Sequence, residues 1–443
     1  MEPNEHKLLN RTVVVVGIAR SGVAAIRLLQ ERGARVRAVD EKLTGEVEGT
    51  PIQPQVEASF TDAGMVVISP GVPADLPILS ELRARGIQII GELELAGFFL
   101  RGDTIGITGS NGKTTTTALT GHILKESNIA CQVGGNIGTP PTAMVATSQA
   151  GQWNVLELSS FQLETVETFH ARIGAALNVT PDHLDRHHTI EAYAAAKARL
   201  FTMQRAGDYA ILNADDPACV SYAALTPATP VWFSTSRLVA RGLDLDGATI
   251  RLDGERLMDA GAIPLRGRHN IENTMAAAAA THLAGATLAQ IAAAVETFPG
   301  VEHRLELVRE LNGVEYYNDS KATNVDATLK ALDAFSGGLW IILGGQDKDS
   351  DYTMLRDSLR KKARAALLIG AAADKIAGQL DGAVPLIHSG TLQAALHTAS
   401  AEAQPGDVVL LAPACASFDQ FDNFEHRGRV FKSMVSQLGQ RGR

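Results

Sequence analysis

The sequence has few cysteines and no long apolar run, and each of these shortages excludes a class of protein. Cys131, Cys219 and Cys415 lie far apart and make no metal-ligand spacing, as expected of reduced thiols in a cytosolic protein. No apolar stretch approaches the roughly 18 residues that cross a bilayer. The polar N-terminus, MEPNEHKLLN, does not resemble a secretory signal. We therefore expect a cytoplasmic protein without membrane insertion.

The sequence also has fewer basic than acidic residues. The 443 residues include 40 Lys and Arg against 49 Asp and Glu, which gives a formal net charge of −9. Such a balance argues against non-specific binding to nucleic acid or to an anionic membrane. A few convergent cations would still suffice to bind a small anionic ligand.

The sequence does contain a repeated alternation of strand-like and helix-like segments, arranged in three blocks. The first block opens with the β-branched run TVVVVG at 12–17, and the second opens with DTIGITG at 103–109. The third repeats the rhythm in short apolar runs such as LWIILGG. Strands that alternate with helices predict parallel sheets covered on both faces. We predict an α/β protein of three domains, with bounds at 1–95, 96–299 and 300–443.

The second block contains a glycine turn between a strand and a helix. The strict phosphate-loop pattern requires a glycine where Ile107 stands, so TGSNGKT is a shorter variant of it. Glycines let consecutive N–H groups face an anion, and the N-terminus of the following helix adds its dipole. Lys113 would neutralise the outer phosphates, and the Thr114 hydroxyl would ligate Mg²⁺. The predicted nucleotide-phosphate site consists of Gly109, Ser110, Asn111, Gly112, Lys113, Thr114 and Thr115.

The first block has a second glycine turn at 17–22, and Asp40 ends the strand that follows. A dinucleotide-binding domain uses such an acid to bind ribose hydroxyls. The turn lacks the full G-x-G-x-x-G spacing, however. An ordinary tight turn in a doubly wound fold explains the pattern equally well.

Taken together, the motifs resemble the Mur ligase family over nearly the whole chain. They are, in order, TGSNGKT, GGNIG, ELSSFQLE, NVTPDHLDRH, AAK, RHNIEN, EHR, NDSKATN and ACASFDQFDNFEHRG. The central motifs are shared across the superfamily, including folylpolyglutamate synthetases, whereas NDSKATN and ACASFDQF are closer to the D-glutamate-adding branch. The resemblance implies a Rossmann-like N-terminal domain, a central P-loop ATPase domain and a Rossmann-like C-terminal domain.

The resemblance also implies a reaction in the synthesis of a peptidoglycan precursor. ATP would phosphorylate the carboxylate of UDP-N-acetylmuramoyl-L-alanine, and the amine of D-glutamate would then displace the phosphate. A free carboxylate is a poor electrophile, whereas an acyl phosphate has a good leaving group whose charge Mg²⁺ spreads. The implied cofactors are ATP and two Mg²⁺ ions, the implied partners are the two small-molecule substrates, and the implied state is a monomer.

Two residues outside the loop are implied to bind metal together with Thr114. Glu157 ends an apolar strand, at the edge where α/β sheets bind their ligands. His183 would ligate a second Mg²⁺ near the acyl phosphate. Four other potential ligands stand close to it, and the sequence alone does not choose among them: Asp182, Asp185, His187 and His188.

Lys197, in YAAAKARLF, is by itself an ordinary surface lysine on an amphipathic helix. The resemblance implies instead that it carries a carbamate, which would turn a cation into a magnesium-binding anion. With Lys113 and His183, it completes the implied set of catalytic residues.

Further residues are implied to contact ATP from the end of the second block and from the third. Asn270 would lie near adenine, although Asn is also a good helix cap. Arg304 would reach the γ-phosphate, and Asp319 would bind the ribose. Contacts from two blocks to one nucleotide imply a domain closure that excludes water.

The remaining implied contacts are with the two other substrates. D-glutamate has two carboxylates, and the candidates for binding it are Thr323, Lys348, Ser417 and the backbone of Phe424, whereas Lys321 would contact phosphate or bound substrate. Asn136 would meet the muramoyl-peptide end, whereas Arg20, Ser21 and Asp40 would bind the UDP end. Lys42 stands where the family has an arginine and cannot form the same bidentate fork with a diphosphate.

Three other functions compete with this hypothesis. A different Mur-type or folylpolyglutamate-type ligase would share the ATP loop and differ in the amino acid. A nucleotide-switch module would hydrolyse nucleotide without a small-molecule acceptor, although the sequence lacks the Asn/Thr-Lys-x-Asp guanine motif. An NAD dehydrogenase built on the first block would leave Lys113 and its loop unexplained.

Overall fold

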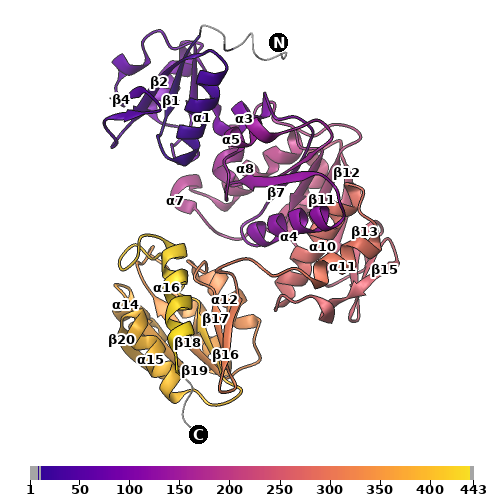
Figure 1. The fold of residues 1–443 in the computed structure, drawn as a ribbon, viewed down its shortest axis with the longest axis vertical. Coiled ribbons are helices and arrows are strands. Elements are labelled where there is room, and N and C mark those ends of the chain that lie inside the picture. The colour runs from indigo at the N-terminus through magenta and orange to yellow at the C-terminus, as the bar shows by residue number, and fades with distance from the viewer. Residues whose placement is uncertain (1–7, 9–10, 440–443) are drawn as a thin grey trace. The chain divides into compact units, whose positions relative to one another are not determined.

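The computed structural model describes residues 8 and 11–439, apart from the side chain of Asp185. It contains three sheets that follow one another along the chain (Figure 1). The chain forms two compact units: the first consists of Met1–Ala262 and Glu272–Phe298, the second of Ile263–Ile271 and Pro299–Arg443. The predicted α/β fold is confirmed, whereas the exact domain bounds stay predictions. Among the described residues, no helix has the length and apolar character needed to span a membrane.

The first sheet belongs to the first unit and has the strand order β3-β4-β2-β1-β5-β6. Its strands pair in parallel, except for the short pair β3–β4. The predicted run of valines forms the central strand β1, and its four valines are buried because a central parallel strand is covered on both faces. The strands are β1 (Thr12–Val16), β2 (Arg35–Asp40), β3 (Glu46–Val47), β4 (Thr50–Pro54), β5 (Met65–Ile68) and β6 (Gln88–Gly91). The helices are α1 (Arg20–Glu31), α2 (Pro77–Ala84) and α3 (Glu92–Gly97).

The second sheet has nine strands in the order β15-β14-β13-β12-β11-β10-β7-β9-β8. The strands from β8 to β13 pair in parallel, and an antiparallel hairpin of β14 and β15 ends the sheet. The strands are β7 (Asp103–Thr108), β8 (Cys131–Gly135), β9 (Trp153–Glu157), β10 (Ile173–Ala176), β11 (Tyr209–Asn213), β12 (Thr229–Ser234), β13 (Gly242–Asp246), β14 (Thr249–Leu252) and β15 (Glu255–Asp259). The helices are α4 (Lys113–Glu126), α5 (Pro141–Met144), α6 (Ser160–Leu163), α7 (Leu184–His187), α8 (Ile190–Thr202), α9 (Pro217–Tyr222), α10 (Arg268–Leu283) and α11 (Leu288–Glu296).

The third sheet lies in the second unit and has the order β16-β17-β21-β18-β19-β20, in which only β16 is antiparallel to its neighbour. Ile341 and Leu343 enter one apolar cluster and Ile342 enters another, so this sheet is covered on both faces as predicted. Its strands are β16 (Glu306–Leu311), β17 (Val314–Asn318), β18 (Leu339–Gly344), β19 (Ala363–Ile369), β20 (Leu386–Gly390) and β21 (Val408–Leu411). Its helices are α12 (Val325–Asp333), α13 (Arg356–Lys362), α14 (Ala373–Leu380), α15 (Leu392–Glu402) and α16 (Phe424–Gln437).

Two buried glutamates of α3 tie the first sheet to the second within the first unit. Glu92 Oε1 accepts hydrogen bonds from the backbone N–H and the hydroxyl of Thr142, at 2.7 and 2.6 Å, where α5 begins. The Glu94 carboxylate accepts from the consecutive backbone N–H groups of residues 167–169. Buried N–H groups need acceptors. The two side chains supply them to the start of α5 and to residues 167–169, both in the part of the chain that forms the second sheet.

The Glu92 contact predicts a dependence of stability on pH. Burial raises the pKa of Glu92 from its ordinary 4.5 to about 7, although the Thr142 donors oppose the shift. The folded protein therefore holds this proton more tightly than the unfolded chain, and stability falls as the pH rises from about 4.5 through 7. Glu92→Gln keeps the acceptor oxygen and removes the titration. We expect it to abolish roughly 1–3 kcal/mol of that loss, measured by urea unfolding at pH 5 and pH 7.5.

The exposed Glu57 supplies the matched control for this measurement. Glu57→Gln should leave the pH dependence of the unfolding free energy as it is in the parent protein. Equal pH dependence in Glu92→Gln and the parent would mean that Glu92 does not titrate differently in the folded protein.

Candidate functional site

The loop between β7 and α4 has a backbone shape that depends on two glycines. Gly109 has φ +153° and Gly112 has φ +86°, which L side chains rarely adopt. A Cβ atom at Gly112 would lie 2.2 Å from Asn273 Oδ1, so there is no room for a methyl group. Helix α4 begins at Lys113, directly after this turn, and Thr114 is buried in its first turn. The loop therefore presents a helix N-terminus, as an anion-binding loop must.

Side chains from neighbouring segments hold this loop in place. The Asn111 N–H donates to Asn178 Oδ1 at 2.8 Å, and Asn178 Nδ2 donates to the Asn111 carbonyl at 3.1 Å. The Ser110 hydroxyl donates to the Thr180 carbonyl and accepts from the Thr180 N–H, both at 2.9 Å. Asn178 closely follows the end of β10, the parallel neighbour of β7. This double pairing fixes the loop from the adjacent strand.

Sequence reasoning missed both asparagines that support the loop. Asn178 lies in NVTPDHLDRH, and Asn273 is the second asparagine of RHNIEN, so both motifs contained them. The signal that could have found Asn178 is its position just after a buried strand, at the ligand-binding edge of the sheet. Asn273 gave no such signal, because its approach to Gly112 depends on how α10 packs.

Two lysines converge on one carbonyl of the loop. Lys113 Nζ donates to the carbonyls of Gly109 and Ser110 at 2.8 and 2.9 Å, and Lys197 Nζ donates to the Gly109 carbonyl at 2.9 Å. Lys197 is only 1% exposed, so its interpretation as a surface lysine is wrong. Its Nζ also lies 4.2 Å from the centre of the Tyr193 ring. Burial, reinforced by the charge of Lys113, lowers the pKa of Lys197 well below its ordinary value.

Glu157 lies beside the phosphate loop because of the strand register. It ends β9 and pairs with Ile107 of β7, and its side chain is buried. Asn136, just after the neighbouring strand β8, donates from Nδ2 to Glu157 Oε1 at 3.0 Å. Two predicted site residues thus contact each other at the carboxyl edge of the sheet. The carboxylate of Glu157 and the hydroxyl of Thr114 are oxygen donors of the kind that Mg²⁺ prefers.

The histidines after β10 differ in their surroundings. His183 has φ +53° at the start of α7, and its side chain is 46% exposed. Its ring centre lies 4.8 Å from that of Phe161. His187, by contrast, is buried and bonded through Nε2 to Ser160 Oγ at 2.9 Å. His187 is therefore buried against Ser160, whereas the side chain of His183 is about half exposed and lies 3.7 Å from the Asp182 carboxylate through Nε2. The choice of His183 as a metal ligand stays a prediction.

The predicted UDP site lies at the carboxyl edge of the first sheet. Asp40 Oδ2 accepts from the Ile18 N–H at 2.8 Å, and Oδ1 accepts from the N–H groups of Lys42 and Leu43, both at 2.9 Å. Burial raises the pKa of Asp40, but these donors outweigh it, so the pKa lies below its ordinary value. The carboxylate thus holds the glycine turn. Arg20 and Ser21, which start α1, follow that turn.

The predicted ATP contacts of the third block belong to the second unit, as does Asn270. Asp319 directly follows β17 and is buried; burial raises its pKa to about 7 although the cations of Arg304 and Lys321 lower it. Its Oδ1 accepts from the Leu305 N–H at 3.3 Å. Asn270 Nδ2 donates to the carbonyl of residue 266 at 2.7 Å. Its side-chain amide therefore bonds the segment just before α10.

The candidate residues for the amino acid follow three neighbouring strands of the third sheet. Lys321 and Thr323 come after β17, Ser417 after β21 and Lys348 after β18, and these strands lie side by side in the order β17-β21-β18. Lys321 Nζ lies 5.3 Å from the ring centre of Phe424, the first residue of α16. The parallel topology thus gathers segments that lie about 100 residues apart in the sequence.

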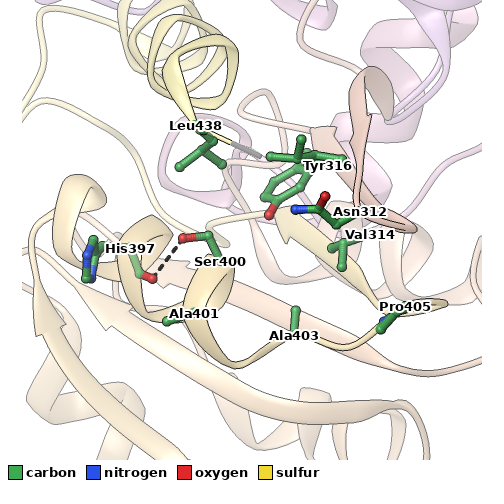
Figure 2. Close-up of a pocket in the computed structure, with 11 residues that line it drawn as sticks. Asn312, Val314, Tyr316, His397, Ser400, Ala401, Ala403, Pro405 and Leu438 are labelled. Carbon is green, nitrogen blue, oxygen red and sulfur yellow. Dashed lines mark hydrogen bonds between the residues drawn. The ribbon is translucent and has the colours of Figure 1, made fainter. Parts of the chain in front are cut away.

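A pocket of about 400 Å³ occupies the opposite edge of the same sheet (Figure 2). Asn312 and Val314 line it where β17 begins, and Pro405 lines it shortly before β21. Tyr316 and Leu438 complete its apolar wall. Because the candidate residues follow the ends of these strands, this pocket is not the predicted amino-acid site.

Comparisons with known proteins match nearly the whole chain to one family. The family models are Mur ligase MurD-like, N-terminal domain, at 11–91; Mur ligase middle domain at 107–281; and Mur ligase, glutamate ligase domain, at 303–415. A UDP-N-acetylmuramoylalanine–D-glutamate ligase of Solibacter usitatus is 61% identical over 437 residues, which cover 98% of this chain and 99% of the relative. A protein of the same name from Acidobacterium capsulatum is 49% identical and covers 98% of both chains.

Solved structures show the same fold at low sequence identity. The UDP-N-acetylmuramate-alanine ligase MurC of Thermotoga maritima has a TM-score of 0.61 at 18% identity, over 96% of this chain and 99% of its own. The MurF ligase of the same organism, solved in complex with ADP, has a TM-score of 0.63 at 16% identity, over 98% of this chain and 97% of its own.

The glycine loop predicts a specific sensitivity at Gly112. Gly112→Ala would place a methyl group against Asn273 and force an alanine into a left-handed conformation, which costs roughly 1–2 kcal/mol by itself. We expect kcat/KM for ATP to fall by about 10- to 100-fold, measured by ADP release.

Gly151→Ala is the control for backbone strain alone, since Gly151 has φ +80° and a Cβ there would meet nothing within 4 Å. It should keep kcat/KM for ATP within about threefold. An unchanged kcat/KM in Gly112→Ala would show that the loop does not need this shape.

Proposed function

Because this chain belongs to the Mur ligase family, we propose that it joins D-glutamate to the L-alanine carboxylate of UDP-N-acetylmuramoyl-L-alanine. The chain is an ATP-dependent, amide-bond-forming ligase of peptidoglycan precursor synthesis. The observation that carries the proposal is the glycine loop, which is held by Asn178 and lies against Asn273, beside the buried Glu157. The identity of the amino acid rests on the relatives that share 61% and 49% of the sequence over nearly its whole length.

The chemistry requires that the carboxylate be activated before the amine attacks. A carboxylate oxygen attacks the γ-phosphorus of ATP, the bond to the bridging oxygen breaks, and ADP leaves. The amine of D-glutamate then attacks the acyl carbon and loses a proton. Inorganic phosphate departs with the former carboxylate oxygen, and an amide remains.

The phosphate loop and its neighbours would serve the first step. The N–H groups from Gly112 to Thr115 would bind the phosphates, because those of Ser110 and Asn111 already donate to Asn178. Lys113 would neutralise the charge that develops on the γ-phosphate. Thr114, Glu157 and His183 supply donors suited to Mg²⁺, which when bound spreads the charge of the phosphates. We assign one metal position to Thr114 and Glu157 and a second to His183.

Lys197 would complete the second metal position as a carbamate. An amine must be neutral to attack CO₂; its nitrogen bonds to the carbon of CO₂, a proton leaves, and an anionic carbamate forms. Burial, reinforced by Lys113 bonded to the same carbonyl, lowers the pKa of Lys197 and so favours the neutral amine. Conversion to an anion would also relieve the repulsion between the two lysines.

Residues of the second unit would bind the rest of ATP and the amino acid. Asn270 is assigned to adenine, Asp319 to the ribose and Arg304 to the γ-phosphate. The two carboxylates of D-glutamate would be bound by cations and hydroxyls at one edge of the third sheet. These groups are Thr323, Lys348, Ser417 and the backbone of Phe424, and Lys321 would contact phosphate or bound substrate.

The UDP-linked substrate would lie along the first unit. Arg20, Ser21 and Asp40 border the glycine turn of the first sheet, where a nucleotide diphosphate would meet the start of α1. Asn136, bonded to Glu157, would contact the muramoyl-peptide end near the reacting carboxylate.

The test of this function is phosphate release with each candidate amino acid. With ATP, Mg²⁺ and UDP-N-acetylmuramoyl-L-alanine present, D-glutamate should raise phosphate release by at least about tenfold, and L-glutamate and diaminopimelate should not. With an ¹⁸O-labelled substrate carboxylate, one labelled oxygen should appear in the phosphate.

Each rival function gives a different outcome in this assay. Stimulation by L-glutamate or diaminopimelate instead of D-glutamate would indicate another amino-acid ligase. Strong turnover with ATP and Mg²⁺ alone would indicate a nucleotide switch. Lys113→Ala serves as the control, because it should abolish ATP-dependent turnover in every arm.

The carbamate on Lys197 predicts a chemical rescue. Lys197→Ala should lose activity by roughly 100-fold or more, because a metal ligand disappears. Acetate or formate should restore part of the activity by supplying a carboxylate, whereas methylamine should not. The measurement is phosphate release against the concentration of each additive.

Lys125→Ala, on the exposed side of α4, is the matched control and should behave like the parent protein. Rescue by methylamine but not by acetate would mean that Lys197 acts as an ammonium group. Full activity of Lys197→Ala would remove it from the site.

A further inference from the structure

The second unit contains a buried cation that no predicted role explains. Arg427, in the first turns of α16, is fully buried, with 0% of its surface exposed. Among the described side chains and backbone, its guanidinium hydrogen-bonds only to neutral oxygen atoms. A buried charge usually has an ion partner, because leaving water is costly. Burial accordingly lowers the pKa of Arg427 to about 10, although Cys415 and Asp419 oppose the shift.

Main-chain and hydroxyl oxygens take the place of a counter-ion. Arg427 Nε donates to Ser320 Oγ at 2.9 Å, and Nη2 donates to the carbonyls of Ser320 and Cys415 at 2.8 and 3.2 Å. Nη1 donates to the Ala416 carbonyl at 3.3 Å. These acceptors are neutral, so they solvate the cation without cancelling its charge.

The acceptors belong to the loops that hold the amino-acid candidates. Ser320 directly precedes Lys321, and Ala416 directly precedes Ser417. The Ser320 hydroxyl also donates to the Phe424 carbonyl at 2.8 Å, which links the same network to the first residue of α16. One guanidinium thus connects the segments after β17 and β21 with the start of α16.

The loop after β18 lies against the same group. Gly345 has φ +138°, and a Cβ there would lie 3.2 Å from Arg427 Nη1 and 2.2 Å from the Ala416 carbonyl oxygen. The N–H of Gln346 donates to that carbonyl at 2.9 Å, and the N–H of Ala416 donates back at 3.1 Å. Lys348 is two residues further along. Arg427 therefore contacts or borders each loop assigned to the amino acid.

We infer that Arg427 is a positioning residue for the amino-acid substrate: it fixes the loops after β17 and β21, borders the loop after β18, and supplies a positive charge beside them. This inference rests on the proposed function, which assigns a dicarboxylate to this edge of the sheet. The planar guanidinium suits the role, because it donates in several fixed directions at once and keeps its charge when buried. The two carboxylates of such a substrate would gain from that charge, because Coulomb attraction is stronger where water is excluded.

The test separates binding of the amino acid from the earlier phosphorylation step. Arg427→Met keeps much of the side-chain volume and removes the charge and the donors. We expect KM for D-glutamate to rise by roughly 30- to 100-fold. KM for ATP, and hydroxylamine-trapped acyl phosphate formed without D-glutamate, should stay within about threefold of the parent. Arg427→Lys keeps the charge but not the planar set of donors, so its KM for D-glutamate should lie between those of the parent and Arg427→Met.

The neighbouring Arg429 provides the control, since it is exposed on the same helix. Arg429→Gln should leave KM for D-glutamate unchanged. Should Arg427→Met fail to fold, as judged by circular dichroism, Ser320→Ala takes its place. It removes the hydroxyl between Arg427 and Phe424 and should raise KM for D-glutamate by about three- to tenfold.

Two results would overturn the inference. One is a folded Arg427→Met, or Ser320→Ala in its place, with parental KM for D-glutamate. The other is an equal loss of trapped acyl phosphate, which would indicate a general structural role. Failure of the proposed function is distinct, because it would appear in the parent protein as absent stimulation by D-glutamate.

Discussion

Parallel pairing is the constraint on which the candidate site depends. Strands that run in one direction all end at the same edge, so the residues that follow them gather there. In the second sheet this edge holds the glycine loop after β7 and Glu157 at the end of β9. In the third sheet it holds the loops after β17, β21 and β18. The common direction of the strands is therefore enough to bring together chemical groups that are far apart in the sequence.

The sequence allowed the parts of the site that have local signatures to be predicted. The shape of the glycine loop follows from Gly109 and Gly112, and Glu157 follows from an apolar strand that ends in an acid. Arg427 could not be identified in this way, because FEHRGR contains two arginines, and only packing buries one and exposes the other. The order β17-β21-β18 was equally hidden, since β21 lies between two strands that precede it in the chain.

Lys197 and Arg427 show two ways to keep a cation in a protein interior. Both are bonded to main-chain carbonyls, and both pKa values are lowered by burial. A lysine lowered far enough becomes a neutral amine, which is a nucleophile and can be modified. An arginine lowered to about 10 remains charged at neutral pH and has donors to spare for several loops. Burial therefore suits Lys197 for a chemical role and Arg427 for a positioning role.

The loops of the three candidate binding regions are held by contacts within the protein itself. Asn178 bonds the phosphate loop through both of its amide atoms, Asp40 accepts three N–H groups at the first glycine turn, and Arg427 donates to two loops of the third sheet. Ordering a loop on binding would reduce affinity, because the lost conformational entropy opposes association. Loops that are fixed in advance leave more of the interaction energy for holding the reacting groups in line. An acyl phosphate is lost if water reaches it before the amine does. A ligase that forms one therefore needs both the activated carboxylate and the attacking amine to be held in position.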